Sequence, residues 1–492
     1  MRNILKIFSG VIILVLVSKC LGFVRESFVA TIYGAGYISD VYVIEDGLIN
    51  AIYTVCAGVI STTYIPKILE LNKKKKDAFT SNYFNILLSI MILVSIFMII
   101  FSPIILKILV PGFYSMYSTD VIHSLIIITR INMVSLILVF IENYLIVILQ
   151  ANNYFIFSSL QGIVLNFSVI IYLPFFNQYE ITGIIITKII AHLLNAIMLI
   201  VFINYKKIFK YHFIYNIKDN NIAEVFRNAT PVLVVNIVSQ LNYIVDRSMA
   251  SGLDSGSMAL LSYANTIASL LYSVVGTSIC NIAYTKISEK QGDKIKIGKS
   301  FNEYLDLLLC IVLPCCVVMC VDSDILCRII YGRGKINSDN INVLSRILWL
   351  YIPSNFAMCV RDLYNRLLYI NKNTKIPSLI NMIGLILNII FNFVFTRLIG
   401  VYGLALATSL TGVIALIVSQ IYCKNHLNLK LRKQYSVIVK IIISSLLCCM
   451  IKQVIPCCKL INKIIIVVIS GLISLLIFNY DKFIRERRKG IF

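Results

Sequence analysis

The sequence predicts an all-α, polytopic membrane protein, and two observations carry that prediction: its composition and the length of its apolar runs. Hydrophobic residues make up 59% of the 492 residues and charged residues only 14%, against roughly 45–50% and about 25% in soluble domains. A soluble chain of this composition would have too little polar surface to cover its core. Lipid must therefore be the solvent for much of its surface.

Fourteen apolar segments are long enough to form membrane-spanning helices, each of which needs about 20 mostly apolar residues. The first segment continues from Arg2 and Lys6 into a charged span and not into a small-residue cleavage site, so we expect no cleavable signal peptide. The predicted helices lie near residues 5–33, 38–65, 80–105, 121–149, 156–176, 181–203, 223–250, 256–285, 302–322, 340–370, 376–397, 401–422, 435–455 and 461–480.

The basic residues between these segments predict the orientation of the chain. The N-terminus, the even-numbered gaps and the C-terminal tail together carry 27 Lys and Arg residues, whereas the odd-numbered gaps carry about 8. Because Lys and Arg near span ends stay on the cytoplasmic side, both termini are predicted to face the cytoplasm. This asymmetry accounts for most of the formal net charge of +22, so no nucleic-acid partner is needed to explain it.

Cysteine spacing and loop length argue against several function classes. The 14 cysteines include adjacent pairs, such as Cys315–Cys316, whose spacing fits neither zinc ribbons nor redox motifs. The loops are too short for an extramembrane catalytic domain, and the chain carries no nucleotide-binding or nucleophile motif. We therefore expect a protein that is not an enzyme and that draws energy from the membrane potential or an ion gradient.

Ten basic residues lie inside the predicted spans, where a cation at the bilayer centre costs roughly 2.5–3.5 kcal/mol. Lys19, Arg25 and Glu26 lie deep in the first span, and Asp40 begins the second. These charges form either a structural ion pair or a water-filled cavity for an anionic, amphipathic substrate, whose phosphate oxygens an Arg fork would bind. Four other cations lie near span ends and are expected to reach the headgroups: Lys188, Arg227, Arg346 and Lys440.

Several stretches resemble, in order along the chain, the motifs of the MurJ/MviN lipid II flippases. The opening signature is Ser18–Glu26, followed by Tyr33–Gly36 and Asp40. Any one motif is weak, but the ordered set, from about residue 10 to 420, is specific. The further matching stretches are Leu149–Phe155, Val245–Ser251, Ser262–Asn265, Arg366–Tyr369, Asn373–Pro377 and Gly403–Leu410.

The resemblance implies a MATE-like fold of the wider polysaccharide-exporter superfamily, with two six-helix lobes, a cationic cavity and two extra C-terminal helices. On this chain the lobes would span residues 1–220 and 221–423, and residues 424–492 would hold the extra helices and a basic cytoplasmic tail. The family moves undecaprenyl-diphosphate-linked peptidoglycan precursor (lipid II) across the bacterial plasma membrane by alternating access, for cell-wall synthesis. The implied partners are this lipid-linked glycan and membrane lipids, and the implied state is a monomer.

By motif, Lys19, Arg25 and Asp40 fall on functional cavity positions of the family, with Lys19 in place of the usual Arg. Two departures weaken the resemblance in the cavity. The second helix is neutral near Tyr53 and Thr54, where the family often has a basic pair.

The other departure is Thr266, which stands where the family usually has Arg in the eighth helix. Either Arg247 and Arg361 substitute for the missing cations, or the substrate is another polyprenyl-linked oligosaccharide of a capsule or exopolysaccharide. A drug or cation antiporter of the same fold would favour acidic cavity residues. A membrane glycosyltransferase would need a larger outer loop than residues 323–339.

Some family members bind sodium, and the matching positions here are Asp246, Asn388, Asn392 and Thr408. Asn388 and Asn392 are four residues apart and share one helix face. Oxygen ligands suit a hard cation, although Asn392 stands where the sodium-binding members have a carboxylate. The alternative is that Asp246 simply pairs with the adjacent Arg247. Sodium is thus a possible coupling ion, and no cofactor is required.

Overall fold

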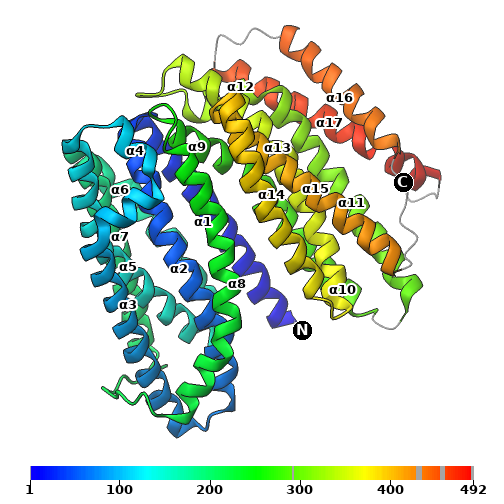
Figure 1. Ribbon diagram of the computed structural model, residues 1–492. Coiled ribbons are helices and arrows are strands. Elements are labelled where there is room, and N and C mark those ends of the chain that lie inside the picture. The colour runs from blue at the N-terminus through cyan, green and yellow to red at the C-terminus, as the bar shows by residue number, and fades with distance from the viewer. Residues whose placement is uncertain (1, 291–292, 428–434, 455–459, 489–492) are drawn as a thin grey trace. The chain divides into compact units, whose positions relative to one another are not determined.

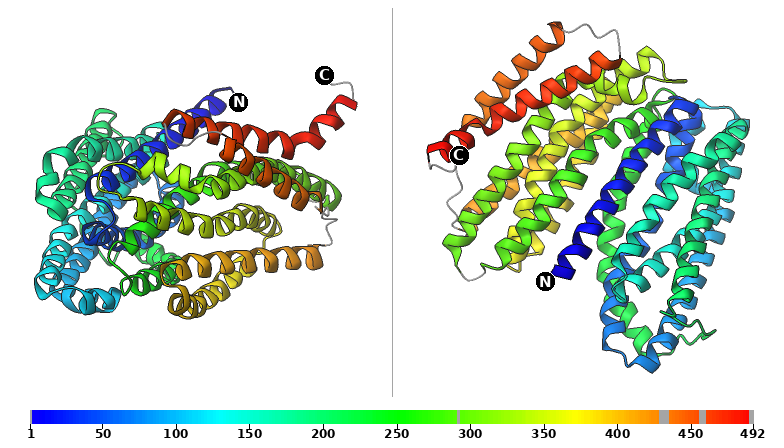
Figure 2. Two further views of the ribbon diagram at one scale, coloured as in Figure 1. Left: turned by 90° about the horizontal axis from the view of Figure 1, so that it is seen from above. Right: turned by 180° about the vertical axis from the view of Figure 1, so that it is seen from behind.

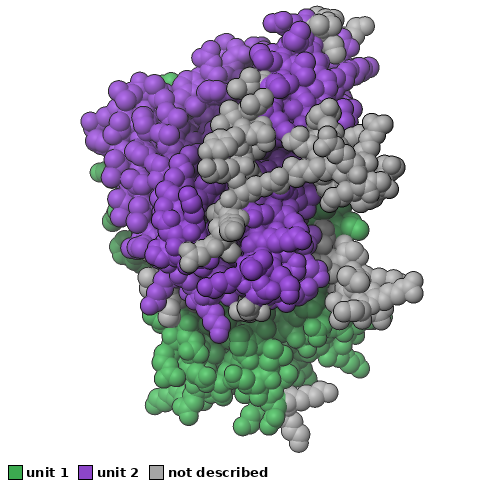
Figure 3. Space-filling view, turned by 90° about the vertical axis from the view of Figure 1, so that its right-hand side faces the viewer, with its two compact units in different colours: residues 1–259 green, residues 260–492 purple. Residues whose placement is uncertain are grey.

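The fold is mostly helical in the part that the structure, a computed structural model, describes: all residues except 1, 291–292, 428–434, 455–459 and 489–492 (Figure 1). No strand occurs among these residues. The chain divides into two compact units, residues 1–259 and 260–492 (Figure 3). The eighth predicted segment begins at this boundary, and the seventh, assigned from the sequence to the second lobe, belongs to the first unit.

The helices of the first unit lie side by side (Figures 1 and 2). α2 packs against α5 and α8, whereas α6 packs against α1 and α7. The helices of this unit are α1 (Arg2–Tyr33), α2 (Tyr37–Glu70), α3 (Lys73–Leu109), α4 (Pro111–Met116), α5 (Thr119–Ala151), α6 (Phe155–Phe176), the 3₁₀ turn Asn177–Tyr179, α7 (Glu180–Tyr205) and α8 (Asn220–Ala250).

The second unit is built around α13, which packs against α11 and α15, while α15 also packs against α14. α9 begins at the end of the first unit and continues through a π-helix into α10. The helices are α9 (Ser257–Leu270), the π-helix (Leu271–Gly276), α10 (Thr277–Ser288), α11 (Lys294–Val321), α12 (Ser323–Tyr331), α13 (Ser338–Ile370), α14 (Lys375–Ile399), α15 (Val401–Leu427), α16 (Tyr435–Val454) and α17 (Leu460–Arg488).

Each of the fourteen predicted segments falls on a helix, and ten helical stretches in the described residues are long and apolar enough to cross a membrane. Several helices extend past their apolar core; α3, for example, begins at Lys73 because lysine is a good helix former. The sequence did not predict α4, α12 or the π-helix. The first two are too short to show a span, and a π turn leaves no mark on an apolar run.

Aromatic rings form much of the core of the first unit between α2, α3 and α5. Tyr64 stacks on Tyr83 with ring centroids 6.2 Å apart, and Phe79 stacks on Tyr83 at 5.8 Å. Tyr144 meets Tyr64 edge-on at 5.6 Å and donates its hydroxyl to the Thr80 carbonyl at 2.7 Å. Buried tyrosines need such partners for their hydroxyls, so these contacts hold the three helices in one register.

Candidate functional site

Arg25, the main predicted cation of the first unit, is paired with an acid. Its Nη2 donates to Oε1 of Glu26 at 2.5 Å, and Tyr42 of α2 donates its hydroxyl to the same oxygen at 3.1 Å. The Arg25 and Glu26 side chains are 17% and 14% exposed. Arg25 Nε is buried and has no hydrogen-bond partner among the described residues. Arg25 and Glu26 therefore form an ion pair, which is one of the two arrangements that the sequence left open, with one donor of the guanidinium unused.

Lys188 of α7 forms a second pair in the same unit. Its side chain is 7% exposed, its ammonium contacts Asp46 of α2, and it lies 5.4 Å from the centre of the Tyr42 ring. The prediction that Lys188 reaches the headgroups is wrong, because this buried lysine has a carboxylate within the protein. Together the two ion pairs, Arg25–Glu26 and Lys188–Asp46, carry no net charge. This cluster thus lacks the surplus positive charge of a phosphate site.

Asp40 is the cap of a helix. It is 2% exposed, its Oδ2 accepts the backbone N–H of Gly256 at 2.6 Å, and its Oδ1 accepts that of Ala259 at 2.8 Å. A carboxylate there satisfies free amides at the start of α9 and complements the helix dipole. Gly256 has φ +88°, a conformation that favours glycine. Asp40 is therefore closed to a substrate in this structure, contrary to an open cavity position.

Arg247, predicted as a substitute cation, stacks on a neighbouring ring. Its guanidinium carbon lies 4.8 Å from the centre of the Tyr243 ring, and Nη1 donates to the Met258 carbonyl at 3.5 Å. It borders a cavity of about 40 Å³ that Gly47 and Val110 also line. Lys19 lies on α1, partly buried, two turns before Arg25. Arg247 thus has contacts within the protein that a ligand would have to share.

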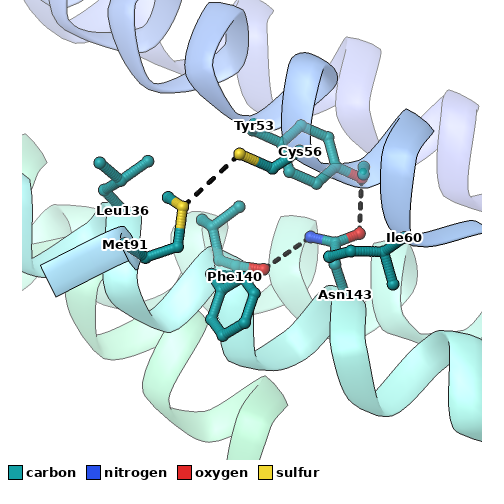
Figure 4. Close-up of a pocket in the computed structure, with 9 residues that line it drawn as sticks. Tyr53, Cys56, Ile60, Met91, Leu136, Phe140 and Asn143 are labelled. Carbon is teal, nitrogen blue, oxygen red and sulfur yellow. Dashed lines mark hydrogen bonds between the residues drawn. The ribbon is translucent and has the colours of Figure 1, made fainter. Parts of the chain in front are cut away.

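The neutral position at Tyr53 is also closed. Tyr53 donates its hydroxyl to Oδ1 of Asn143 at 2.7 Å, and the Asn143 amide donates to the Val139 carbonyl at 2.6 Å (Figure 4). Cys56 and Met91 meet through their sulfur atoms at 3.5 Å on the other side of a cavity of about 10 Å³. That volume suits about one water molecule, so this part of α2 supplies neither charge nor room for a substrate.

Arg361 of the second unit makes no hydrogen bond or ion pair with any other described residue, and its side chain is partly exposed. The adjacent acid, Asp362, has its Oδ1 3.4 Å from Nε of Arg366, whereas its Oδ2 accepts no hydrogen bond from a described residue. Arg366 also lies over the Tyr284 ring, 5.6 Å from its centre. A cation within a membrane span that forms no ion pair is a candidate for binding an anion.

The helix that carries Arg361 packs against the π-helix Leu271–Gly276. π turns occur often at functional sites. At Gly276 the two helices come so close that a Cβ would lie 2.9 Å from Sγ of Cys359. Thr266, just before the π-helix, donates its hydroxyl to its own helix, to the Ser262 carbonyl at 2.8 Å. The free cation in this region therefore comes from α13.

The candidate sodium ligands are only partly brought together. Asn388 and Asn392 are buried on α14, and the Asn392 amide donates to Oδ1 of Asn388 at 2.9 Å. Thr408 of the adjacent α15 donates to the Leu404 carbonyl at 3.0 Å. Because a carbonyl oxygen has two lone pairs, these oxygens fit a cation even while accepting a hydrogen bond. Asp246 lies on α8, in the first unit.

Two buried titratable groups, Glu142 and His192, escaped the sequence prediction. Glu142 of α5 is 2% exposed and meets Nδ1 of His192 of α7 at 3.1 Å. In the sequence these two residues are visible only as a lone acid and a lone histidine inside apolar runs. Glu45 of α2, fully buried, likewise accepts hydrogen bonds from Thr129 at 2.5 Å and Asn132 at 2.9 Å. No group of three or more His, Cys, Asp or Glu in the described ranges could hold a metal ion.

Known proteins resemble this chain along most of its length. The sequence model described as "Lipid II flippase MurJ" matches residues 29–475. The chain belongs to the lipid II flippase MurJ family. A probable lipid II flippase MurJ of Rickettsia prowazekii is 26% identical over 412 residues, which are 82% of this chain and 80% of that one. One of Buchnera aphidicola subsp. Acyrthosiphon pisum is 24% identical over 461 residues, 90% and 88% of the two chains.

Solved structures show the same fold. A lipid II flippase MurJ in an inward closed conformation matches with a TM-score of 0.82 at 24% identity, over 96% of this chain and 99% of that one. An inward-facing multidrug resistance MATE family transporter of the MOP superfamily matches with a TM-score of 0.69 at 12% identity, over 84% and 94%. The MATE-like fold is confirmed. This MurJ-family chain is a multi-pass protein of the bacterial plasma membrane.

Proposed function

We propose that this chain translocates lipid II, undecaprenyl-diphosphate-linked peptidoglycan precursor, from the inner to the outer leaflet by alternating access, without catalysing a reaction. The MurJ match over residues 29–475 carries the proposal. A diphosphate-sugar headgroup cannot cross hydrocarbon unaided, whereas the polyprenyl tail can stay in lipid. The protein therefore has to supply a polar, cationic path for the headgroup alone.

Each unit holds one arginine that we expect to be able to bind a diphosphate: Arg25 in the first and Arg361 in the second. Arg361 has its guanidinium free for phosphate oxygens, which an Arg fork binds bidentately. Arg25 binds when phosphate replaces Glu26 as its partner. Lys19 and Arg247 add positive charge, and Asp40 holds the start of α9 in place.

The proposed topology has fourteen spans, with both termini in the cytoplasm and a monomer as the working unit. Its support is that each of the fourteen apolar segments falls on a helix and that basic residues gather in the N-terminus, the even-numbered gaps and the C-terminal tail. Labelling of single cysteines placed in successive gaps, from each side of the membrane, tests this order.

Sodium is the coupling ion that we propose, with Asn388, Asn392 and Thr408 as its ligands in the second unit. The buried oxygen atoms of the two asparagines support it. The resemblance also implies Asp246, which belongs to the first unit. Sodium should raise the unfolding temperature of the purified protein more than equal potassium does. An Asn388→Leu variant should lose that difference, and an unchanged sodium effect in this variant would contradict the site.

Complementation tests the main proposal. The chain is expressed in a bacterium whose own lipid II flippase can be switched off, beside Arg25→Ala and Asp40→Ala variants at matched membrane levels. We expect rescue by the wild type and loss of rescue in Arg25→Ala. Failure of the well-expressed wild type would contradict lipid II as the substrate.

A flippase for another polyprenyl-linked oligosaccharide is the second candidate. The observations that favour it are the neutral residues Tyr53, Thr54 and Thr266 and the charge-balanced cluster of the first unit. Both candidates share a diphosphate and a lipid tail and differ in the glycan. Rescue of a strain that lacks a capsule-unit flippase, without rescue of lipid II transport, would select this alternative.

A further inference from the structure

The segment between α7 and α8, residues 206–219, runs as an extended strap along the start of α3 (Figure 1). Asn82 of α3 holds the strap with two bonds: its amide donates to the Asn216 carbonyl at 2.9 Å, and its Oδ1 accepts the Asn216 N–H at 2.7 Å. Asn85 donates to the Ile214 carbonyl at 2.9 Å, and the His212 N–H donates to the Ser81 hydroxyl at 3.1 Å.

The strap alternates between residues bound to α3 and residues that point outward. The backbone of His212, Ile214 and Asn216 is hydrogen-bonded to α3, while most side chains of the strap, those of His212 and Asn216 included, are exposed. Because an extended chain turns successive side chains to opposite faces, the polar ladder on α3 sets an apolar row outward. The row consists of Phe213 (81% exposed), Tyr215 (49%) and Ile217 (61%). Tyr211 turns to α3 instead, where its hydroxyl donates to Oδ1 of Asn85 at 2.9 Å and its ring centroid lies 6.3 Å from that of Phe84.

The α3 side chains of this ladder have no other role that would explain their burial. Asn82 and Asn85 are 2% and 6% exposed, and a buried amide costs free energy unless it is hydrogen-bonded. The strap supplies those bonds. Its place, and the outward direction of the apolar row, are therefore fixed by the helix beneath it.

Positive charge surrounds the apolar row. Four exposed lysines lie in the strap, while its acid, Asp219, caps α8 by accepting the Asn221 N–H at 2.9 Å. Lys206 also lies 5.3 Å from the centre of the Tyr205 ring, itself 77% exposed. Aromatic rings beside lysines suit the boundary between acyl chains and anionic headgroups. The four lysines are Lys206, Lys207, Lys210 and Lys218.

We propose that the strap binds anionic phospholipid, with the apolar row seated at the interface and the lysines on the phosphates of phosphatidylglycerol headgroups. This binding does not depend on which glycan the protein transports.

A single tryptophan makes the proposal testable. Trp349, the one tryptophan of the sequence, is 56% exposed on α13. In a Trp349→Phe background, Phe213→Trp places the reporter on the strap, and Tyr215→Trp is a second reporter should the first variant fold poorly. The full-length protein is reconstituted in phosphatidylcholine vesicles that contain an equal fraction of either brominated phosphatidylglycerol or brominated phosphatidylcholine.

Brominated phosphatidylglycerol should quench the strap reporter at least about twofold more than brominated phosphatidylcholine does. Trp349 in the wild type is the matched control and should show no preference. Replacing the four lysines with glutamine should remove the preference, and Asn82→Ala, which releases the strap, should weaken it. Equal quenching by the two lipids, no quenching by either, or the same preference at Trp349 would each overturn the proposal.

Discussion

The two compact units treat an arginine inside a span in opposite ways. In the first, Arg25 lies against Glu26 at 2.5 Å, and its charge is balanced within the protein. In the second, the acid beside Arg361 forms its ion pair with Arg366, and Arg361 has no ion pair with a described residue. An arginine in an apolar run therefore does not by itself indicate a binding site. What distinguishes the two arginines is whether an ion pair has already formed.

The strongest test of this comparison removes the unpaired charge. Arg361→Ala should lower translocation at least about tenfold, because a hydrogen bond to a charged group is worth about 1.5–3 kcal/mol. The translocation rate of Arg361→Lys should lie between those of the wild type and Arg361→Ala, since lysine keeps the charge and loses the bidentate guanidinium. The readout is lipid II exposed on the outer face of cells at matched membrane levels.

Arg397→Ala is the control for this first test. The Arg397 guanidinium lies over the Phe393 ring, 3.9 Å from its centre, at the end of α14, and its loss should leave translocation near the wild-type rate. Normal translocation by Arg361→Ala would show that the free cation is not used.

The paired cation should matter for stability. Lys188→Met removes the partner of Asp46, which is 31% exposed, and we expect a loss of about 2–3 kcal/mol, below the range for a fully buried pair. Thermal unfolding in detergent measures the change. The double variant with Asp46→Asn should recover most of it, and Arg361→Ala should leave the unfolding temperature unchanged. Equal destabilisation by Lys188→Met and Arg361→Ala would contradict the difference that we infer between the two units.

The smallest expected effect comes from removing the ion-pair partner of Arg25. Glu26→Gln removes the acid but keeps an acceptor for the Tyr42 hydroxyl, so Arg25 gains charge for a ligand. Binding of undecaprenyl diphosphate, followed by native mass spectrometry, should tighten by about three- to fivefold. Adding Arg25→Ala should cancel the gain. Weaker binding by Glu26→Gln would mean that Arg25 and Glu26 together, and not Arg25 alone, bind the diphosphate.

The helices could be predicted from the sequence because each must be apolar over about 20 residues to cross the bilayer. Their ends could not, since charged residues such as Lys73 continue a helix outside the lipid. The π-helix at Leu271–Gly276 was also invisible, because its cause is the packing against α13 and not its own composition.

The site was predictable only where its partners are neighbours in the chain. Arg25 and Glu26 are adjacent, so their pairing was one of the two arrangements that the sequence offered. Lys188 is 142 residues from Asp46, so its position near a span end suggested a headgroup contact. Which distant helices meet is a property of tertiary packing, and no spacing within a single span records it.

The cap that Asp40 provides links the order of synthesis to the order of assembly. Asp40 and Gly256 are 216 residues apart, so α2 is made long before the amides that its carboxylate binds. A nascent chain that ends near residue 220 lacks both those donors and α8, which packs on α2. Insertion of the early helices must therefore produce a provisional arrangement, which reaches its final packing only when α8 and the first turn of α9 have left the ribosome.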